Sequence, residues 1–442
     1  MRDDLSVAVY TLGCRLNQVE SEAVSLAFSR AGFHVVSPDD NADIYVVNTC
    51  TVTSKSEQKA RRVIRKFASE NPDSLVIVTG CYAQLNGPDI EALGENILVI
   101  KQEEKSRLLE LPSYAGEFDW KSGASLKKEV SFRLEAAPRI KTKFDFLPDS
   151  FCFHTRASLK VQDGCNNFCA YCRIPFARGR SESMDFRKAV DMAVNIEKNG
   201  YKELVMTGVN ITAYENGGYR LRDLIREILR STSDIRIRMS SLGPYDDFEN
   251  FEFFISEERI CPHFHLSVQS GSDSILKAMG RKYPAGRLKT ITDILKASGR
   301  DPFISGDVIT GFPGETDDDF MDSYDLIKEC GFASCHVFPY SPRPETRAFR
   351  MKPRVPERVS RDRAEKLASL ADQLYLEYAA RQQGRMENVI IEEETVLDGT
   401  RYFAGLSSNY LKVHISENAP LAVGKICSVK LDVRNGAVFG VL

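Results

Sequence analysis

The chain of 442 residues carries 59 Lys and Arg against 62 Asp and Glu, which gives a formal net charge of −3. With 43% hydrophobic and 27% charged residues it has the composition of a folded globular protein, so a disordered or fibrous chain is excluded. No apolar run reaches the roughly 18 residues of a membrane helix, and no apolar segment follows Met1-Arg2-Asp3-Asp4. We therefore expect a soluble, cytoplasmic protein of about two to four domains with no membrane contact.

The first hundred residues alternate short β-branched runs with helical segments. Helices are expected over about 17–31 and 54–69, and strands at 6–10, 44–47, 75–78 and 97–100. Continuous apolar strands separated by helices are typical of parallel sheets buried on both faces. The sequence therefore predicts an α/β domain with a parallel sheet over residues 1–115.

Charged and proline-containing sequence over 116–155 predicts a linker. In 156–384 the alternation resumes, with strands near 159–161, 203–206, 235–239, 263–268, 303–309 and 334–338. Six βα units predict a partial (βα)6 barrel, which is followed by a long helix over about 357–383. Short strands punctuated by glycines over 385–442 predict a small OB-like barrel of five strands.

Eleven cysteines in a chain with no expected export signal do not indicate a disulfide scaffold. Three of them, Cys165, Cys169 and Cys172, form a C-x3-C-x2-C loop directly after the predicted strand at 159–161. Three thiolates in so short a loop can share one metal centre and leave a coordination position open, whereas structural sites are closed by a fourth ligand. A zinc knuckle that borrows a distant fourth ligand is the alternative.

This loop, at the end of the first strand of a βα barrel, resembles that of the radical S-adenosylmethionine (SAM) enzymes. The resemblance implies a [4Fe–4S] cluster held by Cys165, Cys169 and Cys172, with SAM chelated at the open iron and cleaved to a 5′-deoxyadenosyl radical. It also implies that Tyr171 packs near the adenine of SAM.

A second set of cysteines ends three different strand segments. Cys14 follows the strand at 6–10, Cys50 follows 44–47 and Cys81 follows 75–78. In a parallel sheet these positions meet at the carboxyl edge, where α/β sheets bind ligands. The alternative is that each is a buried packing residue. Beside the first set, a second open cluster is the better interpretation.

Together the two sets resemble the radical SAM methylthiotransferases, which carry two [4Fe–4S] clusters and a C-terminal RNA-binding TRAM domain. The segments 11–17, 48–53 and 162–165 look most like the MtaB-type branch, and 405–413 resembles the TRAM signature. The resemblance implies conversion of N6-threonylcarbamoyladenosine at position 37 of tRNA, 3′ of the anticodon, to its 2-methylthio derivative. The implied partners are the tRNA anticodon loop and a reductant such as flavodoxin or ferredoxin.

Further site residues are expected, some from this resemblance and some from their place in the sequence. Segments that look like SAM-contact loops contain Gly208, Asn210, Gln269, Ser270, Asp307 and Gly311. Arg178 and Arg180 follow the cysteine loop and are nominated to bind the carboxylate of the substrate. In the C-terminal segment, bases are expected to stack on Tyr402, Phe403 and Tyr410. No catalytic residue beyond the cluster ligands is assigned.

Three other functions stay open at this point. A methylthiotransferase for isopentenyladenosine in tRNA, or for a ribosomal protein, would share every cluster residue. A non-catalytic iron–sulfur protein that binds RNA would explain the C-terminal segment, but it would leave two open clusters without a purpose.

Overall fold

The computed structural model describes residues 5–114, 118, 122–136, 143–146, 148, 150–397, 399–416 and 421–442. It divides into two compact units, and the chain passes from one to the other several times. The first comprises Met1–Phe153, Lys160–Phe168 and Cys172–Met184, and the second comprises His154–Leu159, Cys169–Tyr171 and Asp185–Leu442. Within the described part of the chain, no helix combines the length and the apolar character that crossing a membrane would need.

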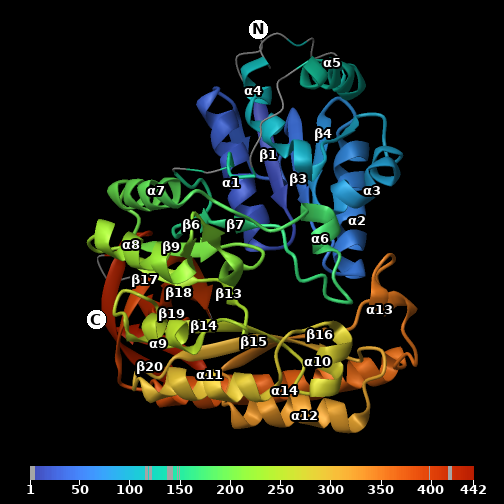
Figure 1. Ribbon diagram of the computed structural model, residues 1–442. Coiled ribbons are helices and arrows are strands. Elements are labelled where there is room, and N and C mark those ends of the chain that lie inside the picture. The colour runs from blue at the N-terminus through green and yellow to red at the C-terminus, as the bar shows by residue number, and fades with distance from the viewer. Residues whose placement is uncertain are drawn as a thin grey trace. The chain divides into compact units, whose positions relative to one another are not determined.

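The first unit is built around a parallel sheet of order β2-β1-β3-β4-β5 (Figure 1). Its strands are β1 (Ser6–Thr11), β2 (His34–Val36), β3 (Ile44–Thr49), β4 (Leu75–Gly80) and β5 (Ile97–Val99). Four of them were predicted, and β2 is an additional edge strand. The central strands β3 and β4 are buried along their whole length, as continuous apolar runs require.

Helices cover both faces of this sheet. They are α1 (Arg15–Arg30), α2 (Ser54–Glu70), α3 (Cys81–Glu91), η1 (Gln102–Leu109), α4 (Leu111–Tyr114), α5 (Gly123–Ala136) and α6 (Ile174–Arg178). One apolar cluster joins Val7 and Ile77 to Phe28 of α1, and the other joins Val47 and Val78 to Ile64 of α2. The predicted α/β fold with a parallel sheet is therefore confirmed.

The predicted linker, 116–155, lies partly outside the described residues, as do the first four residues of the chain. Its described part includes α5, whose Leu126, Val130 and Leu134 belong to the core beneath the first sheet. Two short antiparallel strands, β7 (Gln162–Asp163) and β8 (Glu182–Ser183), bracket the loop that carries Cys165 and Cys172.

The second unit contains the partial βα barrel. Its strands form two sheets, of order β12-β9-β6 and β13-β14-β15-β16. The strands are β6 (Ala157–Lys160), β9 (Glu203–Thr207), β12 (Arg236–Met239), β13 (Ser241–Leu242), β14 (His263–Gln269), β15 (Phe303–Thr310) and β16 (Ser334–Pro339). All six predicted strands are present, and the pairs β9–β12, β14–β15 and β15–β16 are parallel.

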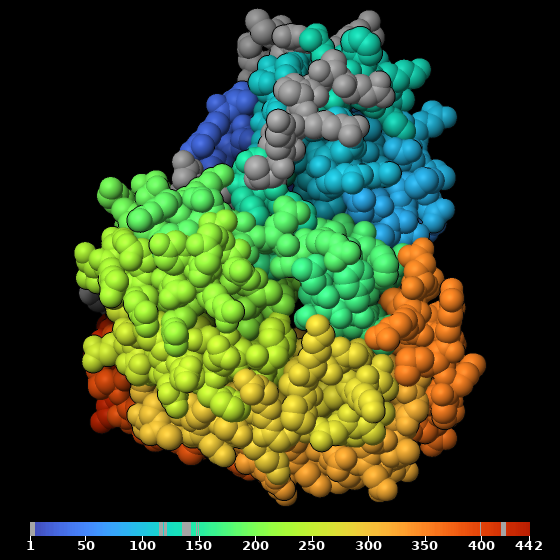
Figure 2. Space-filling model, viewed as in Figure 1, coloured from blue at the N-terminus to red at the C-terminus, as the bar shows by residue number. Residues whose placement is uncertain are grey.

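Helices connect these strands. They are α7 (Phe186–Lys198), η3 (Ile211–Ala213), α8 (Leu221–Ser231), α9 (Phe248–Ser256), α10 (Asp273–Met279), α11 (Gly286–Ala297), α12 (Asp317–Glu329) and α13 (Arg347–Arg350). A small hairpin, β10 (Glu215–Asn216) and β11 (Tyr219–Arg220), precedes α8. On the face shown in Figure 2, the surface of this unit runs from green through yellow to orange, in the order of the chain.

The long helix α14 (Glu357–Arg381) packs along β16 and leads into a closed five-stranded barrel, which we call the C-terminal barrel (Figure 1). Its order is β17-β18-β19-β21-β20, with β17 (Met386–Leu397), β18 (Thr400–Ser407), β19 (Lys412–Ser416), β20 (Ile426–Arg434) and β21 (Ala437–Val441). The OB-like prediction for this segment agrees with the closed barrel.

Buried arginines attach the C-terminal barrel to β12. Arg236 donates hydrogen bonds to the carbonyl oxygens of Asn388 and Leu406, and Arg238 donates to those of Ser407 and Ser408. Both arginines also pair with Glu203 of β9, whose side chain is fully buried. The carboxylate of Glu203 therefore holds the two arginines that bind the C-terminal barrel in place.

Candidate active site

Three cysteines of the first unit lie where neighbouring parallel strands end. Cys14 follows β1, Cys50 follows β3 and Cys81 begins α3 directly after β4. Gly13 has a φ of +102°, and a Cβ atom there would lie 2.5 Å from Cβ of Cys50 and 2.8 Å from its Sγ. Glycine is needed at this position because only a residue without a side chain lets the two strand ends approach so closely.

Burial sets the protonation of these thiols. It raises the pKa of Cys50 to about 12, and the nearby sulfurs of Cys14 and Cys81 add to the shift. Burial likewise raises the pKa of Cys81, against the opposing charge of Arg178. The negative charge of each sulfur disfavours ionisation of the others, which adds to the effect of burial. Such thiols become good ligands only when a metal replaces their protons.

Arg178, which the sequence nominated as a substrate ligand, is buried beside these sulfurs. Its Nε donates to Sγ of Cys81 at 3.2 Å, and its other nitrogens donate to Glu20, Asp163 and Asn17 at 2.6–3.2 Å. Every donor group of the guanidinium therefore has a partner within the first unit. The adjacent Arg180 differs, because it is exposed and lies over the ring of Phe168.

Glu20 is the centre of a buried charge network that sequence reasoning missed. Its carboxylate accepts hydrogen bonds from Lys105 at 2.6 Å, from Lys160 at 3.1 Å and from Arg178 at 3.0 Å. Lys160 also pairs with Asp163 at 2.8 Å. Burial raises the pKa of Glu20, but the three cations outweigh it and hold that pKa well below its usual range.

A signal for this network exists in the sequence. Lys160 stands between Leu159 and Val161 in a strand that otherwise reads as buried, and Glu20 shares a helix face with Leu16 and Val19. A charge at a buried position requires a partner of opposite charge. The sequence does not show which partner, because the members come from α1, η1, β6, β7 and α6.

A cavity of about 370 Å³ opens over this network. Its walls include both nominated arginines and the buried charges, namely Glu20, Lys105, Lys160, Asp163, Arg178 and Arg180. The lining carries charges of both signs. The cavity is therefore suited to a polar ligand.

The cysteines of the C-x3-C-x2-C loop each accept an N–H donor. The backbone N–H of Asn167 points to Sγ of Cys165, and that of Ile174 points to Sγ of Cys172, both at 3.4 Å. In the second unit, Arg281 donates to Sγ of Cys169, also at 3.4 Å. Donors of this kind are typical of thiolates that bind iron–sulfur clusters, since they stabilise negative charge on sulfur.

Arg281 is a site residue that the sequence analysis did not find. It follows α10 and is held by Ser267, whose carbonyl oxygen accepts from it at 3.2 Å, and by the hydroxyl of Tyr283 at 3.0 Å. Tyr171, two positions after Cys169, packs edge-on against Phe312 with ring centroids 6.5 Å apart. Backbone hydrogen bonds from Ala170 to Met279 and from Ala348 to Ala170 fix this part of the loop.

The residues nominated for SAM contacts lie in the second unit, most of them at the carboxyl ends of strands. Gly208 and Asn210 follow β9, Gln269 ends β14 with a φ of +65°, and Gly311 follows β15. Ser270 is buried, and its Oγ lies 3.2 Å from Oγ of Ser323. The topology brings these loops to one end of the barrel, as in other βα barrels.

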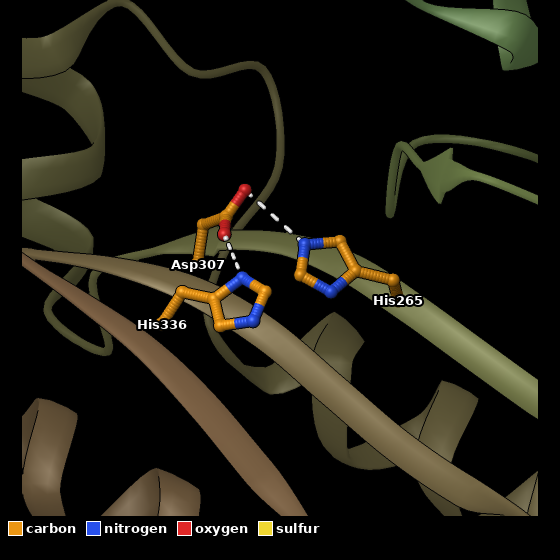
Figure 3. Close-up of side chains that lie close together, drawn as sticks. All are labelled: His265, Asp307 and His336. Atoms are coloured by element: carbon orange, nitrogen blue, oxygen red, sulfur yellow. Dashed lines mark hydrogen bonds and ion pairs between the residues drawn. The ribbon is translucent and has the colours of Figure 1, made fainter. Parts of the chain in front are cut away.

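Asp307 is placed differently, because it lies within β15 between two histidines (Figure 3). One carboxylate oxygen lies 3.2 Å from Nε2 of His265 on β14, and the other lies 3.2 Å from Nδ1 of His336 on β16. Burial raises the pKa of Asp307, but these two hydrogen bonds outweigh it and bring the pKa below the usual range. Asp307 therefore stays ionised at neutral pH.

Two family models match the chain. One described as "Radical SAM superfamily" covers residues 159–327, and one described as "Uncharacterized protein family UPF0004" covers residues 6–100. The first contains the C-x3-C-x2-C loop, and the second contains Cys14, Cys50 and Cys81. The radical SAM family implies SAM and a [4Fe–4S] cluster, and the three loop thiols with their N–H donors fit such a cluster.

Curated relatives extend the similarity to nearly the whole chain. The chain is 36% identical to the threonylcarbamoyladenosine tRNA methylthiotransferase MtaB of Treponema pallidum (strain Nichols), covering 98% of the chain and 99% of the relative. It is 37% identical to the MtaB of Bacillus subtilis (strain 168), covering 96% and 93%. The tRNA-2-methylthio-N(6)-dimethylallyladenosine synthase of Endomicrobium trichonymphae is 29% identical, covering 94% and 97%. The chain therefore belongs to the radical SAM methylthiotransferases, in their MtaB-type branch, and is an enzyme of that class.

Solved structures add support for the fold. The radical S-adenosylmethionine methyltransferase TsrM from Kitasatospora setae matches with a TM-score of 0.53 and 13% identity, covering 90% of this chain and 81% of that chain. At that identity the match speaks for the architecture alone.

Proposed function

We propose that this enzyme converts N6-threonylcarbamoyladenosine, 3′ of the anticodon in tRNA, to its 2-methylthio derivative, using SAM and two [4Fe–4S] clusters. The observation that carries the proposal is the near full-length similarity, at 36% and 37% identity, to relatives named for this activity. The relative named for dimethylallyladenosine is less similar, at 29% identity.

One cluster is assigned to Cys165, Cys169 and Cys172. Bound together with SAM, it supplies a radical that can remove hydrogen from an unreactive carbon such as C2 of adenine. The chain's own contribution is to orient the sulfurs through the backbone N–H groups of Asn167 and Ile174 and the guanidinium of Arg281. An external one-electron reductant, such as flavodoxin or ferredoxin, is the proposed partner.

The second cluster is assigned to Cys14, Cys50 and Cys81, and the buried charges support it. Three cations, Lys105, Lys160 and Arg178, face two anions, Glu20 and Asp163, and all five are buried. Three minus two leaves one positive charge in the protein interior, which is costly without compensation. An anionic iron–sulfur cluster on three thiolates next to Arg178 would supply that compensation.

The C-terminal barrel is the proposed RNA-binding TRAM domain. One of the aromatic residues nominated to stack on bases, Tyr410, already contacts another ring. Tyr410 stacks on His263 of β14 with ring centroids 3.8 Å apart. Elsewhere on the barrel Tyr402, His414 and Phe439 form a partly exposed group with centroids 5.7–6.1 Å apart, and Arg434 lies over Phe439. Unpaired loop bases stack on such surfaces, and the target base must leave its stack to react.

Two cysteine variants test the division of labour between the clusters. Cys14→Ala should still cleave SAM reductively to 5′-deoxyadenosine but form no methylthio product. Cys165→Ala should lose both activities. Equal loss of SAM cleavage in the two variants would contradict the assignment of separate tasks. Iron analysis of each variant controls for a general failure to assemble clusters.

The substrate is tested by mass spectrometry of tRNA nucleosides from a deletion strain. We expect the methylthio form of threonylcarbamoyladenosine to disappear and to return on complementation. Loss of methylthio-isopentenyladenosine instead would assign the enzyme to the sister branch. Unchanged tRNA would favour a ribosomal-protein substrate, and reconstituted enzyme that makes no 5′-deoxyadenosine would favour a non-catalytic RNA-binding role.

A further inference from the structure

Alternate side chains of β14 divide one face of the barrel sheet into three levels. His263, His265 and Ser267 point to the same side, because side chains in a strand alternate between its faces. At about 3.3 Å per residue, successive levels lie about 6.6 Å apart. Positions along this face of the sheet can therefore be given by the nearest of these three residues of β14.

The first and last levels both contact other parts of the second unit. At the first, His263 is buried and stacks on Tyr410 of the C-terminal barrel. At the last, the carbonyl oxygen of Ser267 accepts a hydrogen bond from Arg281, which also donates to Sγ of Cys169. The last level is thus the level of the cysteine loop.

His265 at the middle level contacts Asp307, which contacts His336, and the three come from adjacent strands (Figure 3). His265 is in register with Ser305, and Asp307, two residues beyond Ser305, is in register with His336, so the three side chains share one face and Asp307 reaches His265 diagonally. Asp307 uses one carboxylate oxygen for each histidine. His265 is nearly buried, whereas 64% of the side chain of His336 is exposed.

His336 is therefore a mostly exposed imidazole that Asp307 holds through one nitrogen. Nδ1 faces Asp307, and among the described residues Nε2 has no hydrogen-bond partner. The hydrogen bond with Asp307 raises the pKa of His336, which favours the imidazolium form. On the same face of β16, two residues further on, Phe338 is 39% exposed. An imidazole donor and an aromatic ring thus share one face of β16.

The geometry points to His336 as the residue that binds the carboxylate of the N6 substituent, with Asp307 and His265 as positioning residues; this inference rests on the proposed function. C2 of the base has to face the cysteine-loop level to react. The N6 substituent leaves the ring at a different carbon, so its carboxylate must be bound away from the contact between β14 and the cysteine loop. His336 lies on β16, two strands from β14 in the sheet, which satisfies this requirement, and Phe338 offers a surface for the base.

This assignment replaces Arg178 as the preferred partner of the substrate carboxylate. Arg178 is buried and bonded to Glu20, Asp163, Asn17 and Cys81, so a carboxylate would have to displace one of these groups. His336 binds without such an exchange. A protonated imidazole and a carboxylate form a charge-assisted hydrogen bond, which is stronger than a neutral one.

The test compares two anticodon stem-loop RNAs with the reconstituted holoenzyme. One carries threonylcarbamoyladenosine, and the other carries the same nucleoside with its carboxylate converted to a carboxamide. We expect His336→Phe to lower kcat/KM for the carboxylate RNA about 10- to 100-fold and to leave the carboxamide RNA within about twofold. His336→Arg should restore most of the preference for the carboxylate.

Asp307→Asn tests the positioning role. KM for the carboxylate RNA should rise about tenfold, while kcat and the KM for the carboxamide RNA change little. The matched control is His34→Phe, at an exposed histidine of β2, which should leave both RNAs unaffected.

Three results would overturn the inference. One is equal loss on both RNAs in His336→Phe, which would indicate a structural role. Another is a wild-type enzyme that does not distinguish the two RNAs. The third is a stoichiometric divalent ion such as zinc that is lost in His336→Phe, since the three ligand atoms lie within 4.8 Å of one another. Failure of the proposed function is a separate result, in which the wild-type enzyme modifies only an isopentenyladenosine RNA.

Discussion

Nε of Arg178 lies 3.2 Å from Sγ of Cys81, although the two residues are 97 positions apart in the chain. The first lies in the short helix after the cysteine loop, and the second begins α3. The contact places a permanent positive charge on a proposed cluster ligand. It also connects that ligand, through Glu20, to Lys105 and Lys160.

Replacing Arg178 should change the electronic properties of the proposed second cluster. In a background with Cys165, Cys169 and Cys172 changed to Ala, Arg178→Met should shift the midpoint potential of the remaining cluster negative by about 50 mV, because a nearby cation favours the reduced state. An EPR-monitored redox titration measures this shift. Arg178→Lys keeps the charge and should shift the potential less. Identical potentials in all three proteins would contradict a role for the guanidinium.

Gly13→Ala should disturb the second cluster through crowding. The new methyl group would lie 2.5 Å from Cβ of Cys50, so the strand ends would have to separate. We expect iron bound in the same triple-alanine background to fall by more than half. Gly32→Ala is the matched control, because Gly32 also has positive φ but nothing lies within 4 Å of the added Cβ. Both variants should lose about 1–2 kcal/mol of stability from backbone strain, but only Gly13→Ala should lose iron.

Glu203→Gln should loosen the C-terminal barrel. The buried carboxylate pairs with Arg156, Arg236 and Arg238, and its removal leaves Arg236 and Arg238 without that anion, whereas Arg156 keeps its pair with Glu392. We expect the free energy of unfolding to fall by about 3–5 kcal/mol, measured by urea denaturation. Glu393→Gln, which breaks the exposed pair with Lys412, should cost less than about 1 kcal/mol. Similar costs for the two variants would argue against the anchoring role.

Glu197 should make the free energy of unfolding fall at acidic pH. Burial raises its pKa, but hydrogen bonds from the backbone N–H groups of Ile235, Asp234 and Ser233 outweigh this and bring the pKa below 4.5. Because the folded-state pKa lies below the unfolded value, the stabilisation is complete above 4.5 and is lost as the pH falls through the folded-state pKa.

The measurement for Glu197 compares the wild type with Glu197→Gln. Their difference in the free energy of unfolding should be about 1 kcal/mol at neutral pH and should shrink steadily below pH 4.5. A difference that stays constant across this range would show that the carboxylate charge is not the cause. Asp223→Asn is the control, because Asp223 lies in the capping box of α8 and accepts a hydrogen bond from the backbone N–H of Arg220.

Much of the fold follows from the sequence because apolar periodicity determines it. The strands around Val46, Ile77 and Val205 lie where continuous β-branched runs predict them, and the C-terminal barrel follows from short strands between glycines. The edge strand β2 has only three residues and one exposed position, which leaves too weak a pattern. In α5 the apolar face of Leu126 and Val130 lies within a charged stretch, which hides it.

The candidate site was only partly predictable. The spacing of Cys165, Cys169 and Cys172 and the strand-end positions of the other three cysteines are visible in the sequence. The burial of Arg178 is not, since it depends on Glu20 in another helix. Neither is the contact of Tyr410 with His263, which requires the C-terminal barrel to pack on β14.

That last contact has a consequence for any shortened form of the enzyme. Because Tyr410 covers the buried His263 of β14, a chain cut before Met386 would expose this histidine to water. The buried Arg236 and Arg238 would also lose their carbonyl acceptors in the C-terminal barrel. The C-terminal barrel is in this sense part of the core of the second unit, independent of any nucleic acid it holds.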